Sequence, residues 1–480
     1  MKKLVRLAAA AGASLAALAS CGDNNSATPP DAAPVEPDAA SPDGPAPFVP
    51  PVPFAVPLAA AGPDQLQSAT AAPSGAFYAA GFAGASLTAP RFVTIVKIAA
   101  AGGLDQAFGT DGKATTTLDF RGGAGEIGIA TQPSGKIVVS ATVASPTDAT
   151  DRDVAVIRLN TNGQIDTTFG DNGIRVLDLN TAHNNGTMLV GLDAARGIGV
   201  DSGGRIYVLA ASRGVGTATG GGPRIDTDFT VARLTVDGAP DATWNGGTAN
   251  RLDIQESNAT PRGLRALADG SVIVGGYASS PGVGSTQPVV YKLKSTGELD
   301  SAWGNGGVFH EVVLAVQTEV YNFAVHTSHL VTGGYGRNSG TTNDFVSMRF
   351  DLATGARDLA WGGAPNGAVL VDPSGTKAGS NCRNSIALPG GKTALIGSTG
   401  PTNMPAQDAT VVILDADGRV DAATYGGGIL KFPLGANGND QFWGGAVSGS
   451  AAMFVGYKGG GATPTETTND DAFAVILPLR

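Results

Sequence analysis

The sequence predicts an all-β protein, a seven-bladed β-propeller of four-stranded antiparallel blades, and three observations lead to this prediction. Gly supplies 70 of the 480 residues while only 15% are charged, a composition that demands frequent turns and excludes a helical bundle or coiled coil. One turn motif recurs at intervals of about 60 residues, as in repeat architectures. Seven short apolar runs follow turns, most of them Gly-rich, as strands in hairpins do. An antiparallel solenoid is the alternative architecture.

The first 20 residues have the organisation of an export signal. Lys2, Lys3 and Arg6 precede an uncharged run at 7–19, which as a helix would be only about 20 Å long and too short to span a bilayer. The small residues that precede Cys21 resemble the bacterial lipoprotein box. This resemblance implies that Cys21 is acylated and becomes the mature N-terminus. An ordinary secretory signal with an incidental Cys is the alternative.

Residues 21–52 are predicted to be a lipidated N-terminus and a disordered tether. Eleven prolines occur between Pro29 and Pro57, separated mainly by Ala and Asp, so the segment cannot pack a core and favours extended backbone. We interpret it as a spacer rather than as a proline-rich ligand for a partner. The propeller is expected to occupy residues 53–480.

Three repeated elements define the propeller units. The turn motif reads Gly-x-x-Asp-x-x-(Phe/Trp)-Gly and begins at 102, 163, 238, 297, 355 and 418, with Asn245 in place of the last Gly and one extra residue before Tyr425. A hairpin dipeptide recurs at 74–75, 134–135, 203–204, 269–270, 328–329, 390–391 and 449–450. A short apolar strand recurs at 92–98, 154–159, 229–234, 289–293, 345–350, 410–414 and 473–477. In the second unit we therefore expect strands at 113–120, 126–132, 136–141 and 153–159.

These motifs resemble the bacterial delta-60 repeat, which pairs an "LDxxFGxxG" turn with a "qpDGkivvaG" hairpin and a "dfalxRl" strand. The best matches are residues 104–112, 132–139 and 153–159, and the resemblance extends over residues 65–480. It implies a β-propeller module and no particular activity, because the function of the family is largely uncharacterised.

The sequence also indicates how the ring closes. The first unit has only three strands before the turn at Asp105, so residues 54–58 are expected to supply the twenty-eighth strand by pairing with the C-terminal strand. Pro57 suits an edge strand because proline cannot donate a ladder hydrogen bond. The pattern leaves open which strand of each blade is innermost.

The charged residues of the repeat have a structural and a functional interpretation. The turn carboxylates can tie the turn through backbone N–H groups, which we favour, or bind calcium. The strand cations can pair with these carboxylates, which we favour, or form an anion-binding ring. The turn carboxylates are Asp105, Asp166, Asp241, Asp300, Asp358 and Asp421, and the cations are Lys97, Arg158, Arg233, Lys292 and Arg349.

No catalytic or metal-binding constellation stands out. The four histidines are His183, His310, His326 and His329, and the pair at 326 and 329 has no evident third ligand for zinc. Cys382 lacks a basic neighbourhood that would activate it, so we expect it to be buried. The sequence thus predicts no catalytic residue, no metal ligand and no cofactor, while a carboxylate pair for glycoside hydrolysis leaves no spacing rule to test.

Charge and anchor together suggest a location and a role. Loss of residues 1–20 would change the net charge from −10 to −13, which disfavours nucleic acid as a partner. We expect a monomeric lipoprotein of the bacterial cell envelope, held by Cys21 to the outer membrane on its periplasmic or surface side. Its expected role is non-catalytic binding or scaffolding, with an unknown glycan or envelope protein as ligand. The alternative is a propeller hydrolase or lyase acting on an extracellular polysaccharide or lactone.

The loops before the apolar strands differ most between units and are expected to gather on one face of the ring. They span 141–153, 211–228, 277–288, 335–344, 398–408 and 457–471. Loops on a rigid scaffold often carry function, and they also tolerate drift, so the sequence alone does not decide between these two interpretations.

Overall fold

The computed structural model describes residues 47–59, 62–86, 88–120, 126–146, 151–180, 183–184, 189–190, 193–400, 407–435, 438–459 and 471–480. Phe48–Arg480 form one compact unit. Cys21, the predicted signal and the tether up to residue 46 lie outside the described residues. Within the ranges given above, the chain contains no helix with the length and apolar character needed to cross a membrane.

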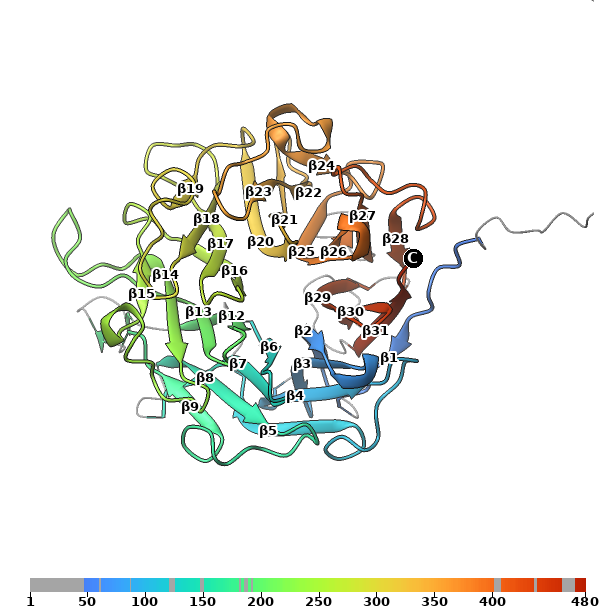
Figure 1. The fold of residues 1–480 in the computed structure, drawn as a ribbon, viewed down its shortest axis with the longest axis horizontal. Helices are drawn as coiled ribbons and strands as arrows, with labels where there is room; N and C mark the ends of the chain where they lie inside the picture. Colours follow the sequence, from blue (N-terminus) through green and yellow to red (C-terminus); the bar gives the residue numbers. More distant parts are fainter. Residues whose placement is uncertain are drawn as a thin grey trace, which may run out of the picture. The chain divides into compact units, whose positions relative to one another are not determined.

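Seven antiparallel sheets stand in a ring around a central channel, which confirms the predicted seven-bladed propeller (Figure 1). In blades 1 to 6 each strand pairs with the next in sequence, and the first strand lines the channel. Blades 1 to 3, from the channel outward, are β2 (Asp64–Ala71), β3 (Phe77–Gly84), β4 (Arg91–Ile98) and β5 (Lys113–Asp119); β6 (Gly128–Thr131), β7 (Ile137–Ala144), β8 (Arg152–Leu159) and β9 (Ile174–Leu177); and β12 (Ala194–Val200), β13 (Ile206–Arg213), β14 (Thr227–Leu234) and β15 (Asn250–Leu252).

Blades 4 to 7 follow the same plan. They are β16 (Thr260–Ala266), β17 (Val272–Ala278), β18 (Gln287–Leu293) and β19 (Val308–His310); β20 (Gln317–Val325), β21 (His329–Arg337), β22 (Asp344–Ser347) with β23 (Arg349–Asp351), and β24 (Val369–Val371); β25 (Ser380–Ala387), β26 (Thr393–Thr399), β27 (Asp408–Leu414) and β28 (Ile429–Phe432); and β29 (Gln441–Ser448), β30 (Ala451–Lys458), β31 (Asp471–Pro478) and β1 (Phe54–Ala55).

Short elements complete the chain. β10 (His183–Asn184) and β11 (Leu189–Val190) form a small separate hairpin. In blade 5 the third strand is interrupted at Met348, so β22 and β23 both pair with β21. The 3₁₀ turns are η1 (Pro73–Gly75), η2 (Asn245–Gly247), η3 (Trp361–Gly363), η4 (Pro365–Gly367) and η5 (Pro389–Gly391).

The ring closes as predicted, by a strand from the N-terminal side of the propeller. Phe54 of β1 lies opposite Ala474 of β31, which makes β1 the outer edge of blade 7. The Asp64 side chain secures this segment, because its Oδ2 accepts the Leu58 N–H at 2.9 Å and that of Ala59. The two ends of the propeller are therefore hydrogen-bonded into a single blade.

The boundary that we predicted for the second unit is wrong by one strand. The strand at 113–120 was expected to open the second unit, yet β5 hydrogen-bonds to β4 and forms the outer edge of blade 1. The turn motif therefore connects the third strand of a blade to the fourth. A repeat read along the sequence is offset from the sheet because hydrogen bonding, and not the position of the motif, defines the blade.

The turn motif forms a contact that repeats between neighbouring blades. Phe169 of blade 2 is buried beneath Gly238, the first Gly of the next motif, where an added Cβ would lie 2.6 Å from the ring. Gly238 has a φ of +86°, a conformation that favours glycine. Gly170, the last Gly of the motif that contains Phe169, donates its N–H to Asp237 O at 3.1 Å. Equivalent pairs are Phe108 with Gly163, Trp244 with Gly297, Trp303 with Gly355 and Trp361 with Gly418.

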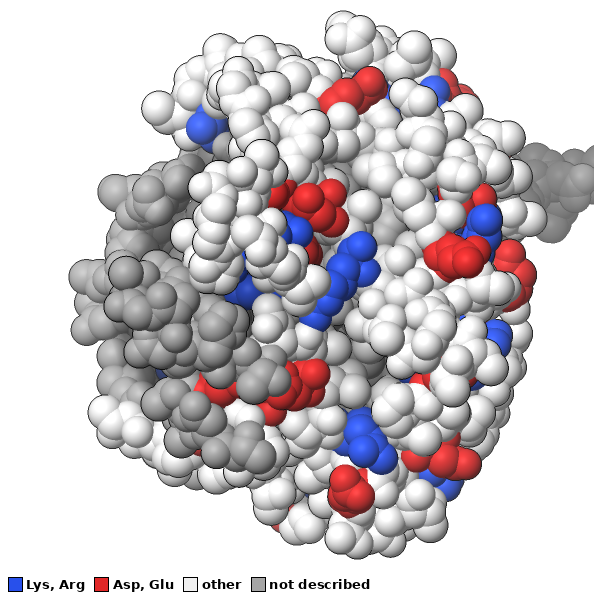
Figure 2. Space-filling view, turned by 90° about the vertical axis from the view of Figure 1, so that its left-hand side faces the viewer, with Lys and Arg blue, Asp and Glu red and all other residues white. Residues whose placement is uncertain are grey.

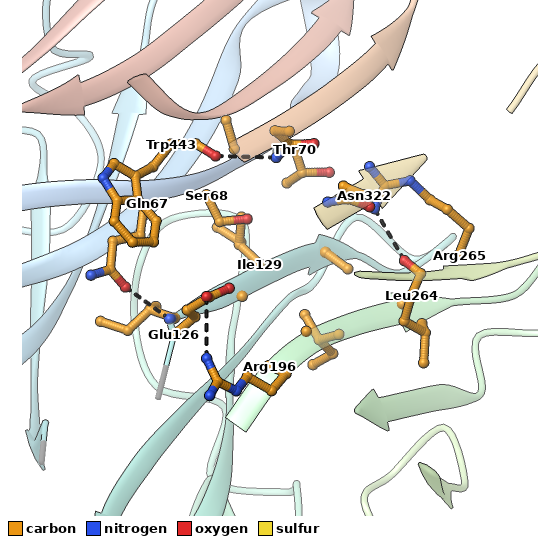
Figure 3. Close-up of a pocket in the computed structure, with 18 of the residues that line it drawn as sticks. Gln67, Ser68, Thr70, Glu126, Ile129, Arg196, Leu264, Arg265, Asn322 and Trp443 are labelled. Atoms are coloured by element: carbon orange, nitrogen blue, oxygen red, sulfur yellow. Dashed lines mark hydrogen bonds and ion pairs between the residues drawn. The ribbon is translucent and has the colours of Figure 1, made fainter. Parts of the chain in front are cut away.

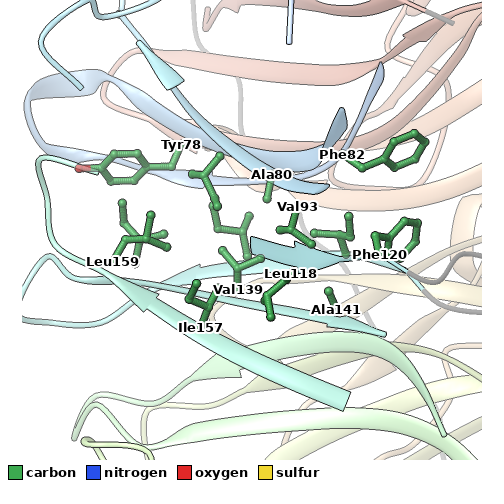
Figure 4. Close-up of a cluster of buried hydrophobic side chains, with 14 of the residues drawn as sticks. Tyr78, Ala80, Phe82, Val93, Leu118, Phe120, Val139, Ala141, Ile157 and Leu159 are labelled. Atoms are coloured by element: carbon green, nitrogen blue, oxygen red, sulfur yellow. The ribbon is translucent and has the colours of Figure 1, made fainter. Parts of the chain in front are cut away.

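Apolar side chains fill the spaces between blades. Figure 4 shows Phe82 and Val93 of blade 1 facing Val139 and Ile157 of blade 2 across one such space. The described residues contain seven clusters of this kind, each drawn from two adjacent blades. Each blade is therefore covered on both faces, and the ring supplies a rigid frame for the channel.

Candidate functional site

A cavity of about 260 Å³ lies in the channel, where residues from the inner strands or just before them meet (Figure 3). All seven blades contribute to its lining. It holds a group of polar and charged side chains, whereas the clusters between adjacent blades consist of aliphatic and aromatic residues. This contrast makes it the best candidate for a functional site.

A β-bulge in the inner strands creates the site. In six of the seven blades the pairing of the first strand with the second shifts by one residue, and the extra residue lines the cavity. Bulges of this kind re-aim side chains and are common beside functional sites. We call these the bulge residues: Gln67, Arg196, Arg262, Tyr321, Arg383 and Trp443.

The bulge residues lie toward one particular end of the channel. Each bulge is near the start of its inner strand, which pairs with the end of the second strand, as Pro261 pairs with Gly276. The ends of the second strands lead into the loops that differ most between units, for example 211–228, 277–288 and 335–344. These loops therefore leave one face of the ring, as expected, and the bulge residues form the channel mouth on that face.

Two of the three bulge arginines share a carboxylate. Glu126, just before β6, accepts hydrogen bonds at Oε1 from Arg196 Nη1 at 3.3 Å and Arg262 Nη1 at 2.5 Å. Figure 3 shows Glu126 and Arg196 reaching toward each other across neighbouring blades. Burial and the charge of Arg262 lower the pKa of Arg196, whereas the negative charge of Glu126 acts to raise it. One carboxylate thus faces two guanidinium groups.

The third bulge arginine is held by aromatic residues. Arg383 Nη1 donates to the Tyr321 hydroxyl at 2.9 Å, and its guanidinium carbon lies 4.9 Å from the centroid of the Trp443 ring. Arg262 lies over the other partner, 4.5 Å from the Tyr321 ring centroid. Tyr321 also shares a 3.0 Å hydrogen bond with Tyr335. Cation–π contacts orient the arginines without neutralising their charge.

A fourth arginine extends the positive charge along the channel. Arg265 is three residues beyond Arg262 on β16, which places it about 10 Å further along the strand. It donates to Phe323 O at 3.0 Å and to Leu264 O at 3.1 Å, and no carboxylate within the described ranges pairs with it. Burial lowers the pKa of Arg265 to about 10, so it remains a cation at neutral pH.

The channel therefore differs in sign from the chain as a whole. Its lining contains four arginines, and Glu126 is the single acidic residue among the described lining positions. Glu319 lies behind the tyrosines, and burial raises the pKa of its carboxyl group. On the side of the ring in Figure 2, by contrast, acidic and basic side chains lie next to one another. The chain carries a net charge of −10, so the concentration of arginines is local.

The repeated Asp and Lys or Arg residues do not contribute to this cavity. They form an ion pair in each turn motif. In five of the six motifs the Asp side chain also accepts a hydrogen bond from a backbone N–H two or three residues ahead. The turn carboxylates therefore tie the turn, as the structural interpretation expects. The pairs are Lys97–Asp105 at 2.8 Å, Arg158–Asp166 at 2.6 Å, Arg233–Asp241 at 2.7 Å, Lys292–Asp300 at 3.8 Å and Arg349–Asp358; Lys392 pairs with Asp421 at 2.5 Å where the strand has Ile413.

The other residues considered from sequence also lie elsewhere. His326 and His329 stack at the β20–β21 hairpin, 4.6 Å apart, and His310 belongs to the outer strand β19. His183 lies in β10. Cys382 is fully buried, as predicted, and burial raises the pKa of its thiol to about 12, which makes it unreactive at neutral pH.

Our sequence analysis missed the bulge residues, although a signal for them exists. In blades 1, 3, 4, 5 and 6 the bulge residue precedes the second residue of the hairpin dipeptide by eight positions, and in blade 7 by seven. Aligning the units on that dipeptide brings three arginines and Tyr321 into one column, with Trp443 one position to the C-terminal side of it. Ile127 occupies this column in blade 2.

Comparisons with known proteins support the fold. Residues 132–169 and 267–302 match the family model described as "Domain of unknown function (DUF5122) beta-propeller". No curated protein matches the chain.

Solved structures with a similar fold are distant in sequence. The polysaccharide lyase Uly1 has a TM-score of 0.46 and 10% identity over 85% of this chain and 88% of that chain. The β-propeller domain of the Trilobed protease from Pyrococcus furiosus has a TM-score of 0.41 and 10% identity over 88% of this chain and 97% of that chain. Sqt1 from Chaetomium thermophilum, bound to the N-terminus of ribosomal protein L10, has a TM-score of 0.42 and 11% identity over 88% and 100%. Together with the family match, the arrangement of blades identifies a β-propeller repeat protein of unknown function.

Proposed function

We propose that this protein is a non-catalytic binding propeller that recognises an anionic ligand at the channel mouth. The observation that carries the proposal is the convergence of Arg196, Arg262 and Arg383 from three different blades, with Glu126 as the one acidic lining residue in the described chain. Arginine is the side chain best suited to bind carboxylate or sulfate groups, because its planar fork donates two parallel hydrogen bonds.

The ligand chemistry follows from the neighbours of these arginines. Tyr321 and Trp443 bring aromatic surface to the same mouth, and such surface packs against the apolar faces of sugar rings. The cavity volume of about 260 Å³ is just below the range typical of sites for drug-sized ligands. We therefore infer that the mouth binds one acidic sugar unit, either free or as part of a longer chain that crosses the loop face.

The alternative, a hydrolase or lyase acting on a polysaccharide or lactone, has less support. Glycoside hydrolysis requires two carboxyl groups on either side of the scissile bond. Among the described lining residues only Glu126 carries a carboxylate, and two arginines already engage it. None of His310, His326 and His329 lines the cavity. Among the described lining residues the site therefore offers groups that hold an anion, and it has no free carboxylate and no His to act as general acid or base.

We further propose that the propeller is held at the bacterial cell envelope by acylation of Cys21. The basic segment, the apolar run and the small residues before Cys21 support this. Replacing Cys21 with Ser is expected to move the protein from the membrane fraction to the soluble fraction of the cell. Retention of the Cys21→Ser variant in the membrane fraction would contradict the anchor without affecting the ligand proposal.

Calorimetric titration of the whole protein tests the ligand proposal. A uronic acid oligosaccharide should bind, a neutral oligosaccharide of the same length should not, and added salt should weaken binding. Arg383→Gln should reduce affinity at least tenfold because Arg383 lacks a carboxylate partner in the described chain and is free to bind the ligand. Arg175→Gln, which changes an arginine outside the channel, is the control. Equal affinity for both oligosaccharides would refute the proposal.

A further inference from the structure

We propose that blade 2 carries a binding site for a hard divalent cation, with Ca²⁺ as the best fit, formed by Asp151, Asp153 and Asp178. One carboxylate oxygen from each residue lies within 4.8 Å of the others. Asp153, on β8, is only 2% exposed, whereas Asp178 lies just after β9 at the surface. The site is separate from the channel, and the proposal does not depend on the function proposed above.

Blade 3 contains the same three carboxylates at equivalent positions. Its cluster, Asp226, Asp228 and Asp253, also has one carboxylate oxygen from each residue within 4.8 Å of the others, and it lies 75 residues further along the chain at each position. The strand registers agree, because Val154 pairs with Leu177 in blade 2 as Phe229 pairs with Leu252 in blade 3. The two clusters can therefore be compared residue by residue within one protein.

In blade 3 a cation from the chain itself occupies the cluster. Arg224 Nη2 lies 2.7 Å from Asp228 Oδ1 and 2.7 Å from Asp253 Oδ1, and its Nε lies 3.0 Å from Asp226 Oδ1. The guanidinium packs against Gly214, where an added Cβ would be 2.5 Å from the guanidinium carbon. Three carboxylates in this arrangement thus bind a cation, and Gly214 provides the space for a large one.

Blade 2 has the carboxylates without the arginine or the space. Ser145 takes the position of Gly214, since its N–H donates to Asp151 O at 3.1 Å just as Gly214 donates to Asp226 O at 3.0 Å. The Cβ of Ser145 would collide with a guanidinium placed as in blade 3. The loop 146–150 contains no Lys or Arg. A guanidinium placed as in blade 3 would therefore not fit here, whereas a smaller cation from solution would.

The buried carboxylate supports this interpretation. Asp153 Oδ1 is buried and has no hydrogen-bond partner, an arrangement that is costly for a charged oxygen. The Asp153 side chain does accept a hydrogen bond from Ser145, but this bond leaves Oδ1 without a partner. Arg152 lines a different cavity, together with Arg196 and Ala194. A bound cation would supply the charge that Arg224 supplies in blade 3.

The donor set indicates the type of cation. Carboxylate oxygens and the Ser145 hydroxyl are hard ligands, which favour Ca²⁺ or Mg²⁺ over thiophilic metals. Ca²⁺ accepts irregular oxygen cages completed by water, whereas Mg²⁺ requires a near-ideal octahedron. With three carboxylates we expect a dissociation constant of about 10⁻⁴–10⁻³ M, as in extracellular calcium modules.

Calcium titration of the full-length protein, followed by calorimetry and thermal unfolding, tests the proposal. We expect one Ca²⁺ per chain and a higher Tm in its presence. Asp178→Asn should weaken binding at least tenfold, and Asp153→Asn should do the same if Asp178→Asn alters folding. Asp253→Asn, the matched change at the exposed position of blade 3, should leave calcium affinity unchanged.

Two results would overturn the proposal. One is the absence of Ca²⁺ binding by the folded wild-type protein at concentrations up to about 10 mM, an order of magnitude above the expected dissociation constant. The other is equal weakening by Asp178→Asn and Asp253→Asn, which would show that binding does not depend on the blade 2 cluster. Folding of each variant is checked by its fluorescence spectrum in the absence of calcium.

Discussion

Replacing Arg158 with Met should destabilise the propeller far more than the same change at the equivalent Lys97. Both residues pair with the Asp of a turn motif, at 2.6 Å for Arg158–Asp166 and 2.8 Å for Lys97–Asp105. Their environments differ, because the side chains of the first pair are 2% and 5% exposed and those of the second are 24% and 30% exposed. The comparison therefore isolates burial at a constant position in the repeat.

The expected magnitudes follow from burial. Removing one partner of a buried ion pair costs about 3–5 kcal/mol, whereas a solvent-accessible pair contributes about 0–1 kcal/mol. Lys136 also bonds to Asp166, at 2.6 Å, so the carboxylate keeps one cation and the loss moves toward the lower limit. Arg158→Met also removes a hydrogen bond to Val236 O in blade 3 and the contact with the Phe169 ring. We expect about 3–4 kcal/mol for Arg158→Met and below about 1 kcal/mol for Lys97→Met.

Urea unfolding monitored by tryptophan fluorescence measures these differences. Adding Asp166→Asn to Arg158→Met should recover part of the loss, because it removes the uncompensated carboxylate, and the double-mutant cycle should give a coupling of about 2–3 kcal/mol. A cost below about 1 kcal/mol for Arg158→Met, or equal costs at the two positions, would refute the argument that burial sets the strength of this pair.

The same pair predicts a response to acid. Burial acts to raise the pKa of Asp166, but hydrogen bonds from Lys136 and Thr168 and the charge of Arg158 outweigh it and hold the pKa below its usual value. Asp166 therefore stabilises the folded state above its unfolded pKa near 4, and this stability is lost as the pH falls through the folded pKa. In Arg158→Met the folded pKa lies closer to the unfolded value, so the acid-dependent loss should be smaller and should be complete at a higher pH.

Three further predictions concern the blade contact, the blade junctions and the channel. Gly238→Ala should lower the free energy of urea unfolding by about 1–3 kcal/mol, because the new Cβ meets Phe169 and the backbone has a positive φ. Gly246→Ala is the control, since Gly246 also has a positive φ but no atom lies within 4 Å of its added Cβ, and it should cost about 1 kcal/mol. Equal costs would contradict the role of the contact with Phe169. Burial raises the pKa of Asp193 to about 7, above its unfolded value, so the Asp193 side chain favours folding below pH 4 and this contribution is lost as the pH rises to 7. Asp193→Asn should therefore reduce the change in unfolding free energy between pH 4 and pH 7 by about 4 kcal/mol. An unchanged pH dependence would contradict the raised pKa. Trp443→Ala should weaken the binding of an acidic oligosaccharide, measured by calorimetry, because Trp443 lies at the channel mouth. Trp244→Ala should instead lower the Tm in thermal unfolding, because Trp244 lies in a contact between blades. The reverse pattern would contradict both assignments.

The sequence predicted the features that every blade must share. A blade contact recurs because each aromatic ring needs a Gly from the next blade, as Phe169 needs Gly238, and this requirement leaves the same letters in each repeat. Ring closure was predictable for a similar reason, since a count of strands left one position for residues 54–58. The blade boundary was not predictable from the motif, because β5 is assigned to blade 1 by its hydrogen bonds with β4.

The candidate site escaped sequence analysis because its chemistry is distributed over the ring. Arg196 and Arg262 are separated by about one repeat length and Arg262 and Arg383 by about two, and each arginine stands alone in its local sequence. Their convergence depends on a bulge that shifts the register by one residue, and a one-residue shift does not alter the visible alternation of a short strand enough to be recognised. The blade 2 acidic cluster was missed for a related reason, since Asp178 approaches Asp153 only through the pairing of β8 with β9.

The turn motif and the bulge residue of each blade are under different constraints, and this difference explains how a repeated blade can carry a specific site. The outer turn must keep its Asp, its aromatic residue and its Gly, because changes there break contacts with the next blade. The bulge residue points into the channel and takes no part in that contact. Among the six blades that have a bulge its identity therefore varies, except that arginine appears three times. Mutual repulsion among buried arginines costs stability unless an anion compensates it. The proposed anionic ligand rests on this imbalance, in which three guanidinium groups and only one carboxylate line the described part of the channel mouth of an acidic protein.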